Sequence, residues 1–303
     1  MSRILILGAG GMLGHKLCQL MPQYGHEVFG AVRKNSDSLD RFREVYSHTT
    51  LMGGVDALDD ASLARTIQDI EPAFVLNCIG IVKQLQKAED AFLSVAINSY
   101  LPHRLARLCE SNGARLVHIS TDCVFSGTSG NYAEGDFSDA RDLYGKSKFL
   151  GETTAVEQCA VTLRTSFIGR ELHRPTHGLV EWFLAQQNKQ VKGFARAIYT
   201  GFTSLELVKV IAQVIEKGPK LHGLFQVASV PINKYELLLL LREIYGLKIQ
   251  IERDENFKCD RSMQSNRFFD ATGYVSPPWT QMILEMCNDS TPYDQFVESN
   301  SHA

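Results

Sequence analysis

The sequence predicts an α/β protein, a Rossmann-type doubly wound parallel sheet with a smaller, discontinuous C-terminal lobe. In the first half of the chain, short and continuously apolar runs alternate with amphipathic stretches, which is the pattern of parallel βαβ units. The first apolar run enters a glycine-rich turn, as in Rossmann domains. A chain of 303 residues is long enough for such a domain and a smaller lobe.

The elements of the first half are expected in strict alternation. The predicted strands are Arg3–Leu7, Glu27–Val32, Ala73–Cys78, Arg115–Ser120 and Val161–Arg164. The predicted helices are Met12–Gln23, Asp60–Ile70, Ala91–Glu110 and Asp142–Cys159. Strands that are apolar along their whole length are buried on both faces, which requires helices above and below the sheet.

After Gly169 the pattern changes. The predicted elements are a helix over Gly178–Gln187, a strand over Val191–Phe194, a helix from the capping box at Thr203 to Glu216, a strand over Leu224–Val227 that returns to the main sheet, a helix from the cap at Asn233 to Tyr245 and a strand over Lys248–Glu252. We therefore expect a Rossmann domain over 1–167, to which 203–227 returns, a substrate lobe over 168–202 and 228–287, and a flexible tail over 288–303.

Composition excludes several classes of function. A formal net charge of −3 gives no footprint for a nucleic-acid polymer or an anionic membrane surface. The longest leucine run, Leu237–Leu241, is far shorter than the roughly 20 apolar residues of a membrane span. Seven scattered cysteines without a Cys-x-x-Cys pair indicate reduced thiols in a cytoplasmic protein, and neither disulfides nor a zinc site. The sequence also contains no cluster of carboxylates that would indicate a magnesium site.

The segment Gly8–Gly14 lies between a predicted strand and a predicted helix. Glycines there allow a tight turn and the close approach of a pyrophosphate to the helix N-terminus. The alternative is a plain junction between a strand and a helix. The candidate cofactor contacts in this turn are Gly8, Gly11, Met12, Leu13 and Gly14.

The end of the second strand bears on the choice of cofactor. A carboxylate at this position would favour NAD, but the sequence has Arg33 and Lys34. Two cations suit a 2′-phosphate, so NADPH is favoured and NADH is left open. The alternative is a solvated basic loop. Further along, Asp56 is a candidate for the adenine amine and, equally, for a helix cap.

Two further strand ends carry candidates. Cys78 and Gly80 follow the fourth strand, where a cofactor ribose would lie, although any strand end uses small residues. Asn98, inside the next helix, is expected to hydrogen bond toward the fourth strand, in a structural or a supporting catalytic role.

Ser120 and Thr121 end the fifth strand at the carboxyl edge of the sheet, where sites of α/β proteins form. A simple strand cap is the alternative.

Tyr144 and Lys148 are the most informative pair. Four residues apart on a helix, they share one face. The ammonium is expected to lower the pKa of the tyrosine toward the working pH, which would make it a tuned proton donor. With the Thr121 hydroxyl and a nicotinamide ring, this pair would reduce a carbonyl.

Together these residues resemble the extended short-chain dehydrogenase/reductases, and most closely the dTDP-4-dehydrorhamnose reductase branch. The motifs that match are the glycine turn, Ser120–Gly127, Tyr144–Lys148 and Leu163–Ser166. The resemblance implies that Tyr144 is the proton donor, that Lys148 holds the nicotinamide ribose, and that Thr121 polarises the carbonyl. It also implies hydride transfer from NADPH to a 4-keto sugar on a nucleoside diphosphate.

The sequence departs from the family at the positions expected to meet the substrate. Cys123 stands where the family commonly has tyrosine, beside Asp122, and an unusual loop brings Lys83 after the fourth strand. Lys83 is a candidate for a sugar or phosphate, or an ordinary surface lysine. Arg261 is a candidate diphosphate clamp, or a member of an ordinary ion pair.

The resemblance predicts an NADPH-dependent reductase of a dTDP- or UDP-linked keto-deoxysugar in surface polysaccharide synthesis. The alternatives are an epimerase or dehydratase on the same scaffold and a regulatory subunit that binds the dinucleotide without turning over a sugar. No membrane or nucleic-acid partner is expected, and a homodimer is left open.

Overall fold

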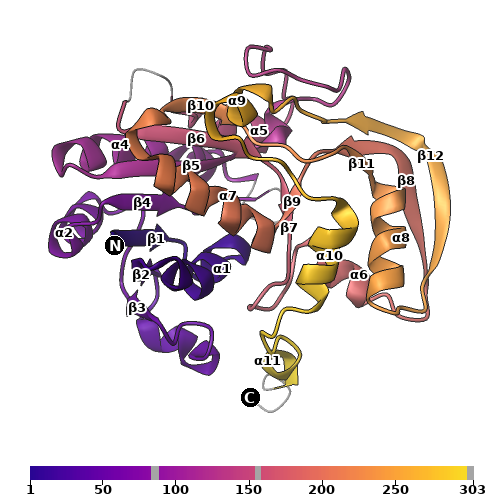
Figure 1. Cartoon of the computed structure of the whole chain (residues 1–303), viewed down its shortest axis with the longest axis horizontal. Coiled ribbons are helices and arrows are strands. Elements are labelled where there is room, and N and C mark those ends of the chain that lie inside the picture. Colours follow the sequence, from indigo (N-terminus) through magenta and orange to yellow (C-terminus); the bar gives the residue numbers. More distant parts are fainter. Residues whose placement is uncertain (83–88, 154–157, 299–303) are drawn as a thin grey trace.

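Figure 1 shows the computed structural model of the chain, whose main body is a parallel sheet of seven strands with helices on both faces. The structure describes residues 1–82, 89–153 and 158–298. Every strand pair in this sheet is parallel. In spatial order the strands are β10 (Gly223–Gln226), β6 (Ala160–Thr165), β5 (Arg115–Thr121), β4 (Phe74–Asn77), β1 (Arg3–Leu7), β2 (Glu27–Ala31) and β3 (Thr49–Met52).

The strand order confirms the predicted Rossmann-type fold. β1 lies between β2 and β4, so the chain reverses its direction of winding at the carboxyl end of β1. Open α/β sheets bind their ligands at such a switch point, because the loops after β1 and β4 separate there. Residues Ile4–Leu7 of β1 are fully buried, as their continuous apolar pattern predicts. The site is therefore expected where β1, β4 and β5 end.

Two layers of helices cover the main sheet. On one face, α1 (Met12–Leu20) packs against α7 (Ser204–Lys217). On the other face, α2 (Asp60–Ile70) packs against α4 (Leu101–Ser111). The short helical turns around these layers are η1 (Met21–Tyr24), η2 (Ser36–Phe42), η5 (Asp122–Val124) and η6 (Gly218–Lys220).

Two predicted helices differ from the observed ones. The helix expected over Ala91–Glu110 is divided into α3 (Ala91–Ser94), a π-helical turn η4 (Val95–Tyr100) and α4. Pro102 explains the break, because proline has no N–H to donate to the carbonyl of Asn98.

The helix expected over Asp142–Cys159 is α5 (Leu143–Leu150) and ends at Gly151. A side chain on Gly151 would collide with the Asn98 carbonyl, since its Cβ would lie 1.9 Å from that oxygen. Residues 154–157 of the expected helix lie outside the described residues.

The second lobe has its own small sheet (Figure 1). In it, β8 (Gln190–Tyr199) pairs antiparallel with β11 (Ile232–Asn233) and parallel with β12 (Gln250–Asp260), and both long strands extend beyond their predicted bounds. β7 (Phe167–Ile168) and β9 (Phe202–Thr203) pair where the chain leaves and re-enters the main body. The remaining helices are α6 (Leu179–Leu184), α8 (Lys234–Ile244), α9 (Asn266–Thr272), α10 (Trp279–Cys287) and α11 (Gln295–Glu298).

Both helix caps predicted in the second half of the chain, at the starts of α7 and α8, are present in the structure. The Thr203 hydroxyl accepts a hydrogen bond from the Glu206 N–H at 3.3 Å, and the Asn233 side chain accepts one from the Glu236 N–H at 2.9 Å. No helix in the described part of the chain combines the length and apolar character needed to cross a membrane.

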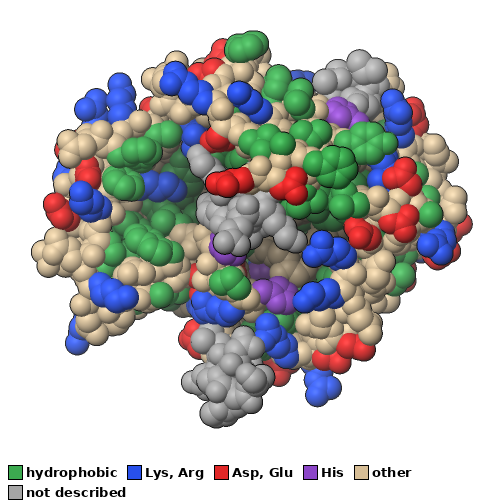
Figure 2. Space-filling view, turned by 180° about the vertical axis from the view of Figure 1, so that it is seen from behind, with side chains coloured by type: hydrophobic (Ala, Val, Ile, Leu, Met, Phe, Trp, Pro, Cys, Tyr) green, Lys and Arg blue, Asp and Glu red, His purple; other side chains and the backbone are tan. Residues whose placement is uncertain are grey.

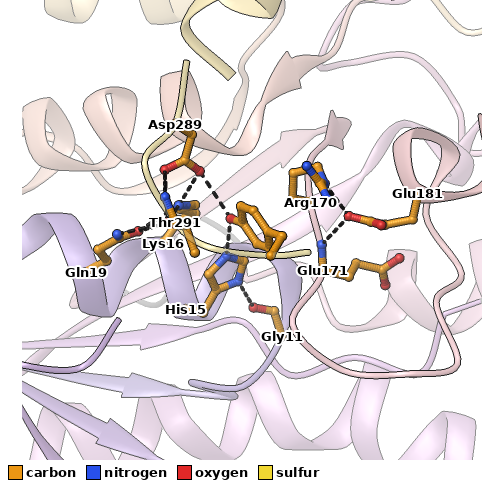
Figure 3. A network of polar contacts seen from close by, with 10 residues as sticks. Gly11, His15, Lys16, Gln19, Arg170, Glu171, Glu181, Asp289 and Thr291 are labelled. Atoms are coloured by element: carbon orange, nitrogen blue, oxygen red, sulfur yellow. Dashed lines mark hydrogen bonds and ion pairs between the residues drawn. The ribbon is translucent and has the colours of Figure 1, made fainter. Parts of the chain in front are cut away.

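The segment after Asn288 differs from the expected flexible tail. Asp289 forms an ion pair of 2.5 Å with Lys16 of α1, and Thr291 accepts a hydrogen bond of 2.7 Å from the same ammonium (Figure 3). Thr291 and Tyr293 are buried. The polar residues that led to the prediction of a flexible tail therefore form a buried polar contact over 289–293. Residues 299–303 lie outside the described residues.

Candidate active site

The glycine turn after β1 has the shape that a dinucleotide needs. Gly8 has φ +83°, a left-handed conformation that favours glycine, and its carbonyl accepts a hydrogen bond from the Gly11 N–H at 3.0 Å. A Cβ on Gly14 would lie 2.1 Å from the Gly8 oxygen, so only glycine lets α1 start so close to the turn. Gly11 is the exposed N-cap of α1, which leaves the positive end of the helix open to a pyrophosphate.

Met12 and Leu13, the two residues after Gly11, can contact a cofactor through their backbone N–H groups rather than through their side chains. Leu13 is buried in the core under the sheet. The Met12 side chain is directed toward the second lobe, since Cβ atoms on Gly169 and Gly178 would lie 3.2 and 2.6 Å from it. Their predicted contact with a cofactor is therefore limited to the first N–H groups of the helix.

Basic side chains lie next to this turn. Arg33 and Lys34 follow β2 and are exposed. His173 lies beside Gly10, and its pKa is lowered by burial and by the charges of Arg41 and Lys34. Figure 2 shows histidine, Lys and Arg side chains around a hollow in the face opposite to that of Figure 1. The residues present thus fit a dinucleotide with a further phosphate.

Asp56 stabilises a turn in the loop before α2. Its carboxylate accepts a hydrogen bond of 2.9 Å from the Leu58 N–H within the loop before α2. The N-cap of α2 itself is Asp59, which accepts from the Ala61 N–H at 2.9 Å. Asp56 is therefore not the helix cap that was one of its two predicted roles.

The residues after β4 lie near Lys148. Burial raises the pKa of the Cys78 thiol to about 12, and the nearby charge of Lys148 opposes this rise. Gly80 lies against the Asn98 side chain, which exchanges hydrogen bonds of 2.9 and 3.1 Å with the backbone of Ile81. Asn98 therefore fixes the loop that follows the fourth strand. The candidate Lys83 lies outside the described residues.

Thr121, Tyr144 and Lys148 meet at the carboxyl edge of the sheet. The Lys148 ammonium is buried, with 4% of the residue exposed, and donates a hydrogen bond of 2.7 Å to the Ile119 carbonyl of β5. The Thr121 hydroxyl donates to Asp122 and accepts from the Cys123 N–H, both at 3.1 Å. The Thr121 side chain also acts on the pKa of the Tyr144 phenol, so the two groups are close to one another. The three side chains predicted to act together are therefore neighbours.

The pKa of Tyr144 moves in the direction opposite to the prediction. Burial raises it, Cys123 adds to the rise, and the hydrogen bond with Thr121 acts against it. Lys148 is not one of the main influences on the Tyr144 pKa. Its ammonium is directed to Ile119, and burial lowers the lysine pKa to about 8. The phenol is consequently protonated at neutral pH, which is the form that donates a proton.

Ser120 has a structural partner. Its hydroxyl donates a hydrogen bond of 2.7 Å to Glu152, and the same carboxylate receives two hydrogen bonds of 2.9 and 2.6 Å from Arg164. All three side chains are buried. The hydroxyl proton of Ser120 thus stabilises the junction of β5, β6 and the end of α5, and the structure does not direct it to a cofactor.

The second lobe closes the other side of the site. Arg261, just after β12, donates a hydrogen bond of 2.8 Å to the Phe125 carbonyl and raises the local positive charge. Burial raises the pKa of Asp122, an effect that Arg261 opposes, and burial raises the pKa of the Cys123 thiol to about 12. A neutral Cys123 is no nucleophile. A pocket of about 150 Å³ is lined by Cys123, Phe125, Ser126, Thr128, Ala140, Arg141, Asp142 and Arg261.

Sequence reasoning missed two residues in this region, Lys234 and Tyr199. Lys234 opens α8 and its ammonium lies 3.7 Å from the centre of the Tyr199 ring. Its charge acts on Asp122. The signal that was overlooked is the position: a cation in the first turn of a helix opposes the helix dipole, so its presence calls for another explanation.

A Rossmann sheet whose switch point holds a glycine turn beside a threonine, a tyrosine and a lysine is built for carbonyl chemistry with a nicotinamide dinucleotide. By class the protein is an NAD(P)-dependent oxidoreductase. Within that class the chain belongs to the family described as "RmlD substrate binding domain", which residues 1–229 match.

Several known proteins resemble the chain. The spore coat polysaccharide biosynthesis protein SpsK of Bacillus subtilis is 28% identical over 299 residues, covering 94% of this chain and 96% of its own. A dTDP-4-dehydrorhamnose reductase of Streptomyces griseus is 31% identical over 156 residues, 51% of this chain and 45% of its own. The dTDP-4-dehydrorhamnose reductase of Bacillus anthracis, solved in complex with NADP, shares the fold with a TM-score of 0.76 and 20% identity, covering 96% of this chain and all (100%) of its own.

Proposed function

We propose that the protein uses NADPH to reduce the 4-keto group of a 4-keto-6-deoxy sugar linked to a nucleoside diphosphate, in the synthesis of surface polysaccharide or O-antigen precursors. The observation that carries this proposal is the meeting of Thr121, Tyr144 and Lys148 beside the glycine turn. The relatives named as reductases of dTDP-linked sugars and as a polysaccharide biosynthesis protein support it. Both dTDP and UDP remain candidates for the nucleotide.

Each side chain then has a definite task. The nicotinamide, when bound, supplies the hydride for the carbonyl carbon. The Tyr144 phenol, kept protonated by burial, donates its proton to the carbonyl oxygen. The Thr121 hydroxyl, which donates to Asp122 in the free protein, turns its proton to the same oxygen. Lys148 uses one of its three N–H donors on Ile119, so two remain for the ribose hydroxyls of the cofactor.

One relative favours a second candidate. The methionine adenosyltransferase 2 subunit beta of Danio rerio is 23% identical over 255 residues, 81% of this chain and 74% of its own. Its name describes a subunit of another enzyme. A protein of that kind would bind the dinucleotide and would keep its function when Tyr144 is replaced by phenylalanine. An epimerase or dehydratase would need the tyrosine but would consume no NADPH.

Oxidation of NADPH, followed by absorbance with dTDP- and UDP-linked 4-keto-6-deoxy sugars, tests the proposal. We expect turnover with one of these sugars and a loss of roughly 100-fold or more in kcat for Tyr144→Phe, with cofactor affinity retained. Tyr100→Phe removes a hydroxyl from an exposed tyrosine on η4 and is the matched control. Tight NADPH binding by the wild type without oxidation would exclude the reductase for these sugars.

A further inference from the structure

The most informative feature outside the expected catalytic set is the lysine that the second lobe brings to the reaction centre. Lys234 is the first residue of α8, and its ammonium lies over the face of Tyr199, which is 3% exposed. The charges of Asp122, Cys123 and Arg261 all act on this ammonium. Asp122, Cys123 and Arg261 are the candidate substrate contacts, so the Lys234 ammonium lies within electrostatic range of that group.

Lys234 has no polar partner in the described part of the chain. Neither a hydrogen bond nor an ion pair within 4.0 Å joins it to Asp122, although each affects the pKa of the other. The buried Tyr199 hydroxyl likewise lacks a hydrogen-bond partner among the described residues. The Lys234 ammonium and the Tyr199 hydroxyl are thus both available to a polar ligand, and Asp122 lies within electrostatic range of the ammonium without an ion pair to it.

The chemistry of the Asp122 carboxylate and the Lys234 ammonium indicates which kind of ligand atom would bind both groups. A carboxylate only accepts hydrogen bonds and an ammonium only donates them, whereas a hydroxyl does both at once. A sugar hydroxyl between Asp122 and Lys234 would donate to the first and accept from the second. Asp122 also accepts from Thr121, which is assigned to the carbonyl oxygen, so this hydroxyl would be a neighbour of the carbonyl. Next to C4 of a 6-deoxy sugar, that neighbour is the C3 hydroxyl.

A purely structural role explains Lys234 poorly. The cation lies at the helix end whose dipole repels it, and burial lowers its pKa to about 8. Contact with the Tyr199 ring returns only part of that cost. Perturbed titratable groups of this kind gather at functional sites.

We propose that Lys234 is a substrate-binding residue that, together with Asp122, holds the C3 hydroxyl of the sugar next to the reacting carbonyl. The proposal rests on the proposed function, because it concerns the same cleft and the same sugar. It assigns recognition of the sugar to the second lobe through Lys234, while Arg261 and the pocket beside it remain candidates for the diphosphate.

Calorimetric binding to protein saturated with NADP⁺ tests this without any turnover. The probes are UDP-glucose and dTDP-glucose, their 3-deoxy analogues, and free UDP and dTDP. We expect Lys234→Met to weaken the better sugar nucleotide by about tenfold to 100-fold and to leave the free diphosphate unchanged, as expected for a hydrogen bond to a charged group. The 3-deoxy analogue should bind wild type and variant equally. Lys258→Met, at an exposed position of β12 in the same lobe, is the control.

The proposal is overturned by unchanged binding of the sugar nucleotide to Lys234→Met, by an equal loss for the free diphosphate, or by discrimination against the 3-deoxy analogue that is as large in the variant as in the wild type. Lys234→Arg keeps the charge and guards against a folding defect, and it should bind the sugar nucleotide better than Lys234→Met does. If the wild type binds the sugar nucleotide but oxidises no NADPH, the proposed reductase fails while the role of Lys234 stands. If it binds no sugar nucleotide, both fail.

Discussion

Two polar clusters in this protein each contain a lysine, fully buried in one and half-buried in the other, and they differ in how completely the ammonium is paired. In the strap cluster (Lys16, Gln19, Asp289 and Thr291), the ammonium has hydrogen bonds of 2.7 Å to Gln19 and Thr291 and an ion pair of 2.5 Å with Asp289 (Figure 3). In the cleft cluster (Asp122, Tyr199, Lys234 and Arg261), the lysine only faces an aromatic ring within the described residues.

The difference separates a structural from a functional use of the same side chain. A buried charge whose donors are all satisfied rigidifies its surroundings, and breaking it leaves an uncompensated charge. A buried charge with unused donors is a cost to the folded protein unless a ligand completes it. The strap cluster is therefore expected to control stability, and the cleft cluster to control binding.

The largest effect should follow from opening the strap cluster. Asp289→Ala leaves Lys16, of whose side chain only 1% is exposed, without its counter-charge. We expect the free energy of unfolding to fall by about 3–5 kcal/mol in urea denaturation. Glu255→Ala removes a half-exposed carboxylate from its pair with Arg253 and should cost no more than about 1 kcal/mol. Equal effects at the two positions would contradict the distinction.

A smaller loss should follow from removing one hydroxyl at the edge of the strap cluster. The Tyr293 hydroxyl lies 2.9 Å from His15 Nε2, and the other ring nitrogen of His15 bonds to the Gly11 carbonyl of the cofactor turn. Tyr293→Phe should lower the free energy of unfolding by about 1–3 kcal/mol, because a buried nitrogen loses its partner. Urea denaturation against Tyr24→Phe, at an exposed position, measures it. No difference between the two would show that the hydroxyl contributes nothing.

The same histidine gives stability a pH dependence. Burial lowers the pKa of His15 to about 3, whereas the unfolded chain takes up this proton near pH 6.5. Its contribution is therefore complete above pH 6.5 and is lost as the pH falls from 6.5 toward 3. The variant His15→Gln should show a shallower fall over this window than the wild type. His222→Gln, at an exposed position, should keep the wild-type slope; an equal slope in both variants would be the contrary result.

The smallest effect on stability is expected in the cleft cluster. Lys234→Met should change the free energy of unfolding by no more than about 0.5 kcal/mol at neutral pH, or raise it, because a desolvated charge is removed. The folded pKa of about 8 lies below the unfolded value, so any advantage of the variant should shrink as the pH rises from about 8 to about 10.5. Thermal unfolding at several pH values checks this. A clear loss of stability would make Lys234 a structural residue after all.

Much of the fold and part of the site followed from local pattern. The apolar runs located every strand of the main sheet except the edge strand β3, which is short and only partly buried. The capping residues Thr203 and Asn233 located two helix starts. The spacing of Tyr144 and Lys148 placed both on one helix, because residues four apart share a face. The pKa of Tyr144 could not be predicted in the same way, since it depends on burial by groups that are distant in sequence.

What the sequence determined by itself is what neighbours along the chain decide: the alternation of strands and helices, the glycine turn, and the order of Thr121, Tyr144 and Lys148. Only the tertiary structure decided that the polar segment after Asn288 is buried against α1, although Thr291 and Lys16 are 275 residues apart. It also decided that the Lys234 ammonium lies over the ring of Tyr199. Propensity and periodicity act over a few residues, whereas the pairing of buried charges depends on how the two lobes pack, which no local pattern encodes.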